Sequence, residues 1–264
     1  MQTEKSTPLT RILSFLFPFV LLGVLWEIAV QTGLITLNSL PAPSLLLRKF
    51  WGLAFESGVL WKHLGKSMAR LLIGYSLAAV AGVLIGMLLA LNGTLKDLFE
   101  PTFSFLMSVP TIAWIPIFLI TLGLGDRTVI TAIFISSFFS IMYSTMRGIE
   151  MVDRSSVRAA RMMGLEGLRL FLFVLLPGSL VSIINGFRLA IGYAWRALVG
   201  GELLAALIEW GMGKMVYQAR YFNDAAVMIV GLLTIGFCGF LLDQIFLITI
   251  EKRTVEKWGM AKKK

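Results

Sequence analysis

The sequence predicts an all-α integral membrane protein with about six transmembrane helices. Of its 264 residues, 57% are hydrophobic and only 15% are charged, and the mean hydropathy is +0.83. The apolar residues gather into long uncharged runs, and Lys and Arg stand mainly in the connectors between them. A soluble core of this length could not bury so much apolar surface, whereas a lipid bilayer covers it.

The predicted spans follow the uncharged runs, because about 20 helical residues cross the hydrocarbon core of a bilayer. We take the whole chain as one transmembrane domain, residues 1–264. Its spans cover residues 12–32, 71–95, 101–123, 128–147, 180–208 and 225–250.

The stretch before the fifth predicted span allows two interpretations. Residues 170–208 are too long for one helix and contain Pro177 and several charges. Two spans here would give seven in total and put the termini on opposite sides of the membrane. Pro177-Gly178 favours a surface segment followed by one helix, which gives six spans. The connectors then assigned to the inside carry about twice as many Lys and Arg residues as those outside, so both termini are predicted to be cytoplasmic.

The net charge of +9 does not indicate a nucleic-acid partner, because the positive residues are spread over the connectors and the C-terminus. One connector, residues 147–169, is the longest polar stretch assigned to the inside. Its apolar residues recur at helical spacing, with arginines at other positions, which predicts a short amphipathic helix. An alternative interpretation is an interfacial helix that lies on anionic lipid.

A motif in this connector carries a family resemblance. Arg158-Ala159-Ala160 is followed after three residues by Gly164, after nine more by Val174, and then by Leu176-Pro177. Every spacing matches the E-A-A, G, I, L-P loop of the membrane subunits of ABC importers, which this segment resembles. The departures are Arg158 in place of Glu and Val174 in place of Ile.

Other segments resemble one branch of that family, the permeases for nitrate, sulfonate and taurine. They are Leu40-Pro41-Ala42-Pro43-Ser44, His63-Leu64 with Ser67 and Arg70-Leu71, Pro110 with Ile115-Pro116, Gly123-Leu124-Gly125, Ala194-Trp195 with Gly201-Glu202, and Gly211-Met212-Gly213 with Ala219-Arg220. Together these segments cover nearly the whole chain.

The resemblance implies a type I ABC importer permease in a bacterial cytoplasmic (inner) membrane. Such permeases form homodimers, and each copy docks on an ATPase subunit, of which there are two. A periplasmic or lipid-anchored binding protein delivers the solute. ATP and Mg would bind the ATPase, so this chain is expected to hold no cofactor and no metal and to have no catalytic residue.

The resemblance also implies a cytoplasmic coupling segment over residues 150–177, in which a short helix docks in a groove of the ATPase. The residues expected to couple the two subunits are Arg158, Ala159, Ala160, Met163, Gly164, Leu176 and Pro177. Small alanines let a partner come close, Gly164 suits a left-handed turn at the helix end, and Leu176-Pro177 should end the segment before the fifth span. Arg158 should need an acidic partner or cap a carbonyl, and we expect an acidic residue or water in the groove to compensate for it.

Charges within the spans are candidates for the translocation pathway, because a charge in hydrocarbon is costly. Arg196 suits an oxyanion, although a contact inside the dimer is the alternative. Arg196 and Glu202 lie about 240° apart around a helix and cannot face the same way. For Glu202 a structural role is favoured over one in the pathway. Pro110 and Pro116 could break the third span and expose backbone groups, or simply kink it for packing.

Signatures of other functions are missing from the sequence. Gly65-Lys66-Ser67 resembles the end of a P-loop, but Leu60 stands where its first glycine is required. The chain has one histidine and one cysteine, which disfavours a metal site or a membrane enzyme. An ion-coupled secondary transporter remains the alternative, although neither a repeat of similar halves nor a coupling-ion site is visible.

Overall fold

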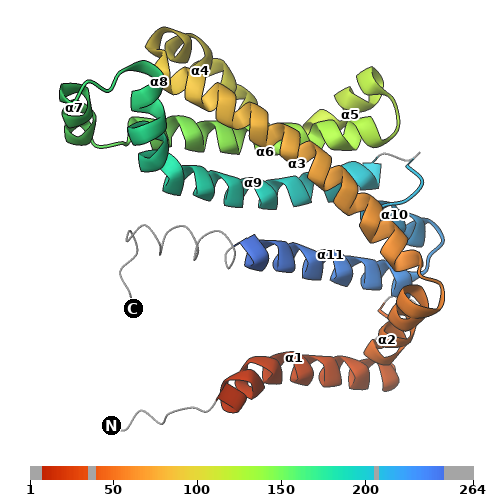
Figure 1. The fold of residues 1–264 in the computed structure, drawn as a ribbon. Helices are drawn as coiled ribbons and strands as arrows, with labels where there is room; N and C mark the ends of the chain where they lie inside the picture. The colour runs from red at the N-terminus through yellow and green to blue at the C-terminus, as the bar shows by residue number, and fades with distance from the viewer. Residues whose placement is uncertain (1–7, 35–39, 205–207, 247–264) are drawn as a thin grey trace, which may run out of the picture. The chain divides into compact units, whose positions relative to one another are not determined.

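The computed structural model describes residues 8–34, 40–204 and 208–246, and nearly all of these are helical (Figure 1). The elements are α1 (Pro8–Gln31), α2 (Pro43–Trp51), the π-helical turn η1 (Gly52–Glu56), α3 (Val59–Leu91), α4 (Gly93–Ser108), α5 (Thr111–Leu122), α6 (Asp126–Glu150), α7 (Arg154–Met162), α8 (Gly167–Leu170), the π-helical turn η2 (Phe171–Leu175), α9 (Leu176–Leu204), α10 (Met212–Tyr221) and α11 (Ala225–Phe246).

The predicted all-α membrane fold is confirmed for the part of the chain that the structure describes. Helices α3, α6 and α11 and the continuous helix Gly167–Leu204 are each long and apolar enough to cross a bilayer. The pair α4 and α5 passes the same test as one span that is bent by 96°. Helix α1 adds a shorter apolar segment, Val20–Gln31.

The chain forms two compact units. One comprises residues 1–61 and 215–233, and the other comprises residues 62–214 and 234–264. We call them the small unit and the large unit and describe each by itself.

Helix α6 is the centre of the large unit, where most of its length is buried against its neighbours. Glycines let α3 come close to it: a Cβ at Gly86 would lie 2.4 Å from the backbone oxygen of Met142, and one at Gly82 would lie 3.0 Å from Ile141. Gly82 and Gly86, four residues apart on one face of α3, therefore act as a close-packing pair. On the other side of α6, Gly186 of α9 leaves no room for a side chain beside Ser144.

Helix α3 begins 12 residues before the predicted start of the second span. The sequence prediction stopped at the charged residue Arg70, but His63, Ser67 and Arg70 are buried on one face of the helix. Polar residues at this helical spacing therefore extend the helix, because other buried groups satisfy them. At the other end, Asn92 caps α4 by accepting a hydrogen bond from the Leu95 N–H at 3.2 Å, so a boundary falls inside the predicted span.

The third predicted span is broken at Pro110. Val109 and Pro110 have extended backbone angles between α4 and α5, because a residue before proline disfavours the helical region. Pro116 is different, since it lies within α5 without ending it.

The expectation that Leu176-Pro177 would end the coupling segment is wrong. Gly167–Leu204 is one continuous helical run, and η2 precedes the proline. There the Leu176 N–H bonds to the Phe171 carbonyl, five residues back. This wider turn accommodates a residue that lacks an N–H and would clash in a regular helix.

The small unit is held by polar contacts at the starts of its helices. The Glu27 carboxylate accepts hydrogen bonds from the Ser44 N–H at 3.0 Å and its hydroxyl at 2.8 Å. Lys49 pairs with Asp224 at 3.1 Å. Partial burial would raise the pKa of Asp224, but the bonds from the Val227 N–H and Lys49 outweigh it and lower that pKa below its usual value.

Several predictions concern residues outside the described ranges, at both chain ends and in one internal segment. These are residues 1–7 with the N-terminus, residues 205–207 of the fifth span, and residues 247–264 with the end of the sixth span and the basic tail. The cytoplasmic location of both termini therefore stays a prediction.

Candidate functional site

The predicted short helix in the connector is present as α7, and its start is fixed by Asp153. The carboxylate accepts hydrogen bonds from the Ser155 hydroxyl and from the N–H and hydroxyl of Ser156. These bonds, led by that from the Ser155 side chain, lower the pKa of Asp153 to about 2. The charged cap satisfies a backbone N–H group that the first turn would otherwise leave without a partner.

The end of α7 is fixed by Gly164. Its φ is +81°, a conformation that favours glycine. The Leu165 N–H donates to the Ala160 carbonyl at 3.0 Å, and the Gly164 N–H donates to the Arg161 carbonyl at 2.9 Å. This pair of bonds is a Schellman motif, and it gives α7 a defined end, as expected of Gly164.

The two alanines of the motif face different ways. Ala159 is exposed, but Ala160 is only 3% exposed, on a helix that contacts η2 and α8. The expectation that Ala160 offers close approach to a partner is therefore corrected: its small side chain lets α7 lie against its own chain. Met163 is 76% exposed, and its neighbour Met162, which the sequence analysis did not single out, is 84% exposed.

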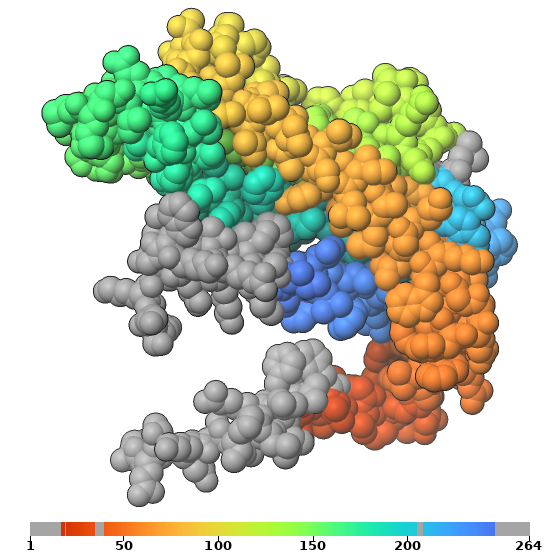
Figure 2. All heavy atoms as spheres, viewed as in Figure 1, coloured from red at the N-terminus to blue at the C-terminus, as the bar shows by residue number. Residues whose placement is uncertain are grey.

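Three exposed arginines form a stripe along α7. Arg154, Arg158 and Arg161 are spaced four and three residues apart, which places them within about 60° of arc on one face. No carboxylate lies within ion-pair distance of them among the residues that the structure describes. We call this set the arginine stripe; α7 lies at the periphery of the large unit (Figure 2).

Leu176 and Pro177 lie apart from the stripe, at the start of α9. Both are half-buried. A Cβ at the next residue, Gly178, would lie 3.0 Å from the Val152 side chain. The end of the motif therefore packs on the chain segment that joins α6 to α7.

Next to α7, four charged side chains join α4 to the end of α6. Lys96 pairs with Glu150 at 2.6 Å, and Arg147 pairs with Glu100 at 2.6 Å and with Glu150 at 3.2 Å. This ionic cluster holds the helix that leads into α7 against the first half of the broken span.

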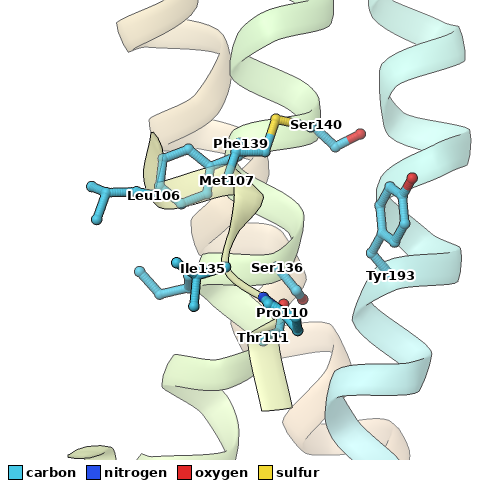
Figure 3. A pocket seen from close by; sticks show the side chains of 10 residues that line it. Leu106, Met107, Pro110, Thr111, Ile135, Ser136, Phe139, Ser140 and Tyr193 are labelled. Atoms are coloured by element: carbon cyan, nitrogen blue, oxygen red, sulfur yellow. The ribbon is translucent and has the colours of Figure 1, made fainter. Parts of the chain in front are cut away.

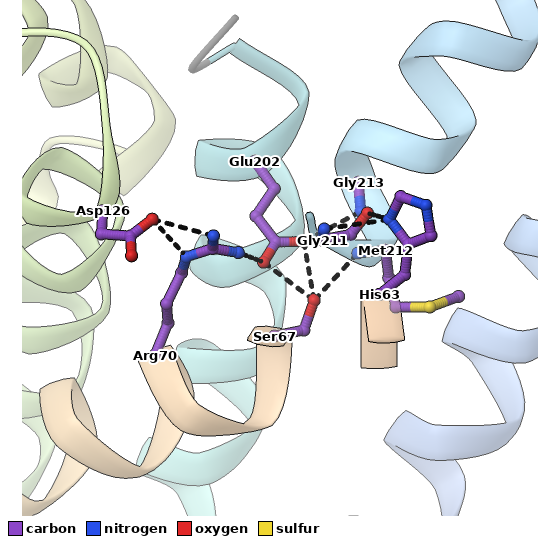
Figure 4. A network of polar contacts seen from close by, with 8 residues as sticks. All are labelled: His63, Ser67, Arg70, Asp126, Glu202, Gly211, Met212 and Gly213. Carbon is purple, nitrogen blue, oxygen red and sulfur yellow. Dashed lines mark hydrogen bonds and ion pairs between the residues drawn. The ribbon is translucent and has the colours of Figure 1, made fainter. Parts of the chain in front are cut away.

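The opposite end of α6 adjoins a buried polar network, shown in Figure 4. The Glu202 carboxylate, with no exposed surface, accepts bonds from Arg70 at 2.7 Å, the Ser67 hydroxyl at 2.8 Å and the Gly213 N–H at 2.9 Å. Arg70 also pairs with Asp126 at 2.8 Å. We call this set, with His63, Gly211 and Met212, the Glu202 network.

Glycines at positions 211 and 213 let the backbone lie against Glu202. A Cβ at Gly211 would lie 2.6 Å from the Glu202 carboxyl carbon, and one at Gly213 would lie 2.7 Å from the Glu202 Cβ. The His63 Nδ1 lies 2.8 Å from the Gly211 carbonyl oxygen and 3.0 Å from its amide nitrogen, so either protonation state of Nδ1 finds a partner. Ser67 accepts from the Met212 N–H at 2.9 Å.

The geometry of Glu202 favours the structural interpretation over the pathway one. All its partners belong to the protein, and its carboxylate reaches no open surface. From the sequence, His63, Ser67 and Arg70 were linked to the family resemblance but not to a polar network. Their spacing at i, i+4 and i+7, on a helix that enters a span, is the signal that could have revealed the network.

Pro110 lines a cleft of about 260 Å³ at the break between α4 and α5 (Figure 3). The other side of the cleft is formed by α6 and by Tyr193 of α9. Pro116 lies exposed on α5. It lines neither this cleft nor the two clefts between α9 and α11.

Arg196 lines two adjoining clefts between α9 and α11. They measure about 380 Å³ and about 700 Å³ and share Gly192, Arg196 and Asp243. Tyr193 lines both the larger of them and the Pro110 cleft. Neither Gly192 nor Tyr193 was predicted from the sequence as a pathway residue, since neither carries a charge.

Among the described residues no group of three or more His, Cys, Asp or Glu side chains could hold a metal ion. The expectation that the chain binds neither metal nor cofactor stays a prediction.

A match to a family model identifies the protein family of this chain. The model of the binding-protein-dependent transport system inner membrane component matches residues 82–253. The chain belongs to this family. It is a permease component of an ABC importer, as the motif predicted, and not a catalytic subunit; the secondary transporter is not favoured.

Three transport permeases are similar in sequence to this chain over most of its length. It is 32% identical over 228 residues to the taurine transport system permease protein TauC of Escherichia coli, covering 85% of this chain and 82% of the relative. Identity to the putative aliphatic sulfonates transport permease protein SsuC of Escherichia coli is 32% over 92% of this chain and 91% of the relative. The bicarbonate transport system permease protein CmpB of Synechocystis is 32% identical over 90% of this chain and 84% of its own.

Solved structures show the same fold. Two crystal forms of the inward-facing MetNI methionine ABC transporter match with TM-scores of 0.64 and 0.58. The first match covers 78% of this chain and 98% of that chain at 18% identity, and the second covers 71% and 96% at 20% identity. At this identity the likeness concerns the fold alone.

Proposed function

We propose that this permease works as a homodimer with two copies of an ATPase subunit and imports a small anionic solute that a binding protein delivers. ATP and Mg bind the ATPase. The observation that carries this proposal is α7, a short helix with both ends fixed and an exposed outer face that no described residue covers. Such a helix can transmit a partner's motion without melting.

The contact with the ATPase is formed by Arg158, Ala159 and Met163 of the predicted set, and by Met162. Ala160, Gly164, Leu176 and Pro177 act differently, because they hold α7 on its own chain and shape its ends. The arginine stripe requires an acidic groove on the ATPase, since three guanidinium groups gain from carboxylate partners. This requirement is specific to the chain, because the motif it resembles has Glu in place of Arg158.

An anionic solute fits both the relatives and the clefts. The named substrates of the three relatives are taurine, aliphatic sulfonates and bicarbonate, and each carries an anionic group. Arg196 lines two clefts of the membrane region, where a guanidinium favours an oxyanion. The bacterial inner membrane, with α7 and both termini on the cytoplasmic side, is the location this function requires.

Reconstituted transport tests the proposal. The permease, its ATPase and its binding protein are placed in liposomes, and uptake of labelled taurine, methanesulfonate and bicarbonate is followed. We expect uptake of at least one of them that requires ATP and the binding protein. A matched complex with Gly164→Val tests the coupling segment, because a branched side chain disfavours φ +81°; it should lose uptake while the permease stays folded. Uptake by the permease without an ATPase would contradict the proposal.

A further inference from the structure

One face of α9 carries two arginines on either side of a glycine. Arg188, Gly192 and Arg196 are spaced four residues apart, so they lie along one side of the helix. Among the described residues, no atom outside the neighbouring backbone of α9 lies within 4 Å of where a Cβ of Gly192 would be, and the residue lines both clefts between α9 and α11. Gly192 is therefore the open floor of a hollow that has a guanidinium at each end.

The charges in this hollow do not cancel. The Arg188 Nε lies 3.6 Å from the Asp243 carboxylate, which offsets one guanidinium. Arg196 lies 5.8 Å from the centroid of the Tyr193 ring, and the ion pairs of the described residues give it no carboxylate partner. The described residues that line the larger cleft thus include two arginines and one aspartate, which sum to one positive charge.

A charge of this kind within a span is costly unless it faces water or a ligand. The larger cleft, of about 700 Å³, can hold a small anion together with water. We propose that the hollow over Gly192 is a subsite for a monovalent oxyanion such as a sulfonate, nitrate or bicarbonate, with Arg196 as its binding residue. Asp243 limits the positive charge to one, so a monovalent anion is neutralised and can leave again, as conduction requires.

The subsite deepens the proposed function but can be tested without transport. The chain has a single cysteine, Cys238. In a Cys238→Ala background, Gly192→Cys puts one thiol on the floor of the hollow. The rates of its reaction with anionic 2-sulfonatoethyl, cationic trimethylammonioethyl and neutral methyl methanethiosulfonate are measured on the full permease–ATPase complex in phosphatidylcholine nanodiscs. The neutral reagent reports access, and the ratio of the anionic to the cationic rate reports the local potential.

The structure predicts a ratio above that of a free cysteine thiol. Arg196→Gln should lower the ratio roughly tenfold and Asp243→Asn should raise it by a similar factor, because the two reagents differ by two charges and the groups lie within several ångströms. Arg196→Lys should preserve the ratio. The ratio is the measure of the potential, because a change in the thiolate fraction alters the rate with the neutral reagent but acts alike on both charged reagents. Millimolar methanesulfonate should slow the reaction, and Arg196→Gln should abolish this protection.

Three results would overturn the subsite. One is a thiol that the neutral reagent does not reach, and another is a ratio that Arg196→Gln leaves unchanged. The third is protection by added phosphatidylglycerol but not by methanesulfonate, which would assign the hollow to a lipid headgroup. Loss of uptake with an intact charge ratio would instead count against the proposed function alone.

Discussion

The charged side chains near the two ends of α6 differ in their partners: at one end they pair within the protein, and beyond the other end they are exposed. At the Asp126 end, the Glu202 network is closed at its buried centre: both oxygens of the Glu202 carboxylate accept hydrogen bonds, and the Arg70 guanidinium pairs with Glu202 and Asp126. At the Glu150 end, the ionic cluster is satisfied, but the arginine stripe of α7 just beyond it is open. At the closed end, mutual pairing offsets the cost of burying the charges, and Glu202 has no exposed surface for a ligand. At the open end, the described residues supply no carboxylate to the arginine stripe.

This difference assigns the two ends different tasks. A buried network with several partners fixes one arrangement of α3, α9 and the segment before α10, because removing Glu202 leaves Arg70 buried without that partner, and removing Arg70 does the same to Glu202. Helix α7, which is capped and exposed, can instead be bound by another subunit. The variants below should therefore damage stability at one end and assembly at the other.

The largest effect is expected from Glu202→Ala. It leaves the buried Arg70 without one carboxylate and the Gly213 N–H without an acceptor, which should cost about 3–5 kcal/mol of stability. The measurement is the midpoint of thermal unfolding in detergent, followed by size-exclusion chromatography. Asp126→Ala is the matched control, since the Asp126 side chain is 58% exposed. Equal losses in the two variants would contradict the closed network.

Close helix packing should give the next largest effect. Gly86→Ala places a Cβ 2.4 Å from the Met142 backbone oxygen, so α3 and α6 must separate, at a cost of about 1–3 kcal/mol. Gly236→Ala on α11 is the control, because its Cβ would meet no atom within 4 Å. The unfolding midpoints of both variants test this, and a Gly86→Ala midpoint equal to that of the control would refute the close approach.

Assembly should respond to the arginine stripe and not to other exposed arginines. Arg158→Glu should weaken binding of the ATPase about tenfold at low salt, because it sets a carboxylate against an acidic groove. Arg127→Glu makes the same change at the other end of α6 and should leave binding unaltered. Titration of the purified ATPase onto each variant in nanodiscs gives the two affinities. Tighter binding by Arg158→Glu would mean that the groove is basic.

The smallest effect concerns the cap of α7. Asp153→Ala should speed amide hydrogen exchange in residues 154–162, whereas Asp153→Asn should not, because asparagine also caps helices. The pKa of Asp153 is lowered to about 2, so its contribution is present above its ordinary pKa and lost only as the pH falls towards 2. Exchange rates corrected for intrinsic pH dependence should therefore be constant from pH 5 to 8. A change within that range would show that the carboxylate does not hold the cap.

The sequence predicted the membrane fold, the family and α7 because these follow from local patterns. Long apolar runs indicate helices, and Gly164 stands where a helix of this motif must turn. Prediction from the sequence failed where contacts with residues far away in the chain determine the local structure. The charge on Arg70 suggested a helix end, but Glu202, 132 positions away, keeps it inside α3.

Two further errors have the same origin. Pro177 ends a helix in most sequences, but the wide turn η2 accommodates it here. Ala160 fits a docking surface by size alone, yet the fold turns it towards η2 and α8. The burial of a side chain depends on what packs on it, and spacing along the sequence does not record that.

The central claim is that α7 is the surface that binds the ATPase, and one measurement tests it directly. The tagged permease is purified from its native host beside a variant in which Arg154, Arg158 and Arg161 are changed to Gln, and the molar ratio of ATPase to permease is determined by quantitative mass spectrometry. We expect a P-loop ATPase at a ratio near one with the unchanged chain and a large loss in the variant, with equal amounts of folded permease. An undiminished ratio in the variant would contradict the claim.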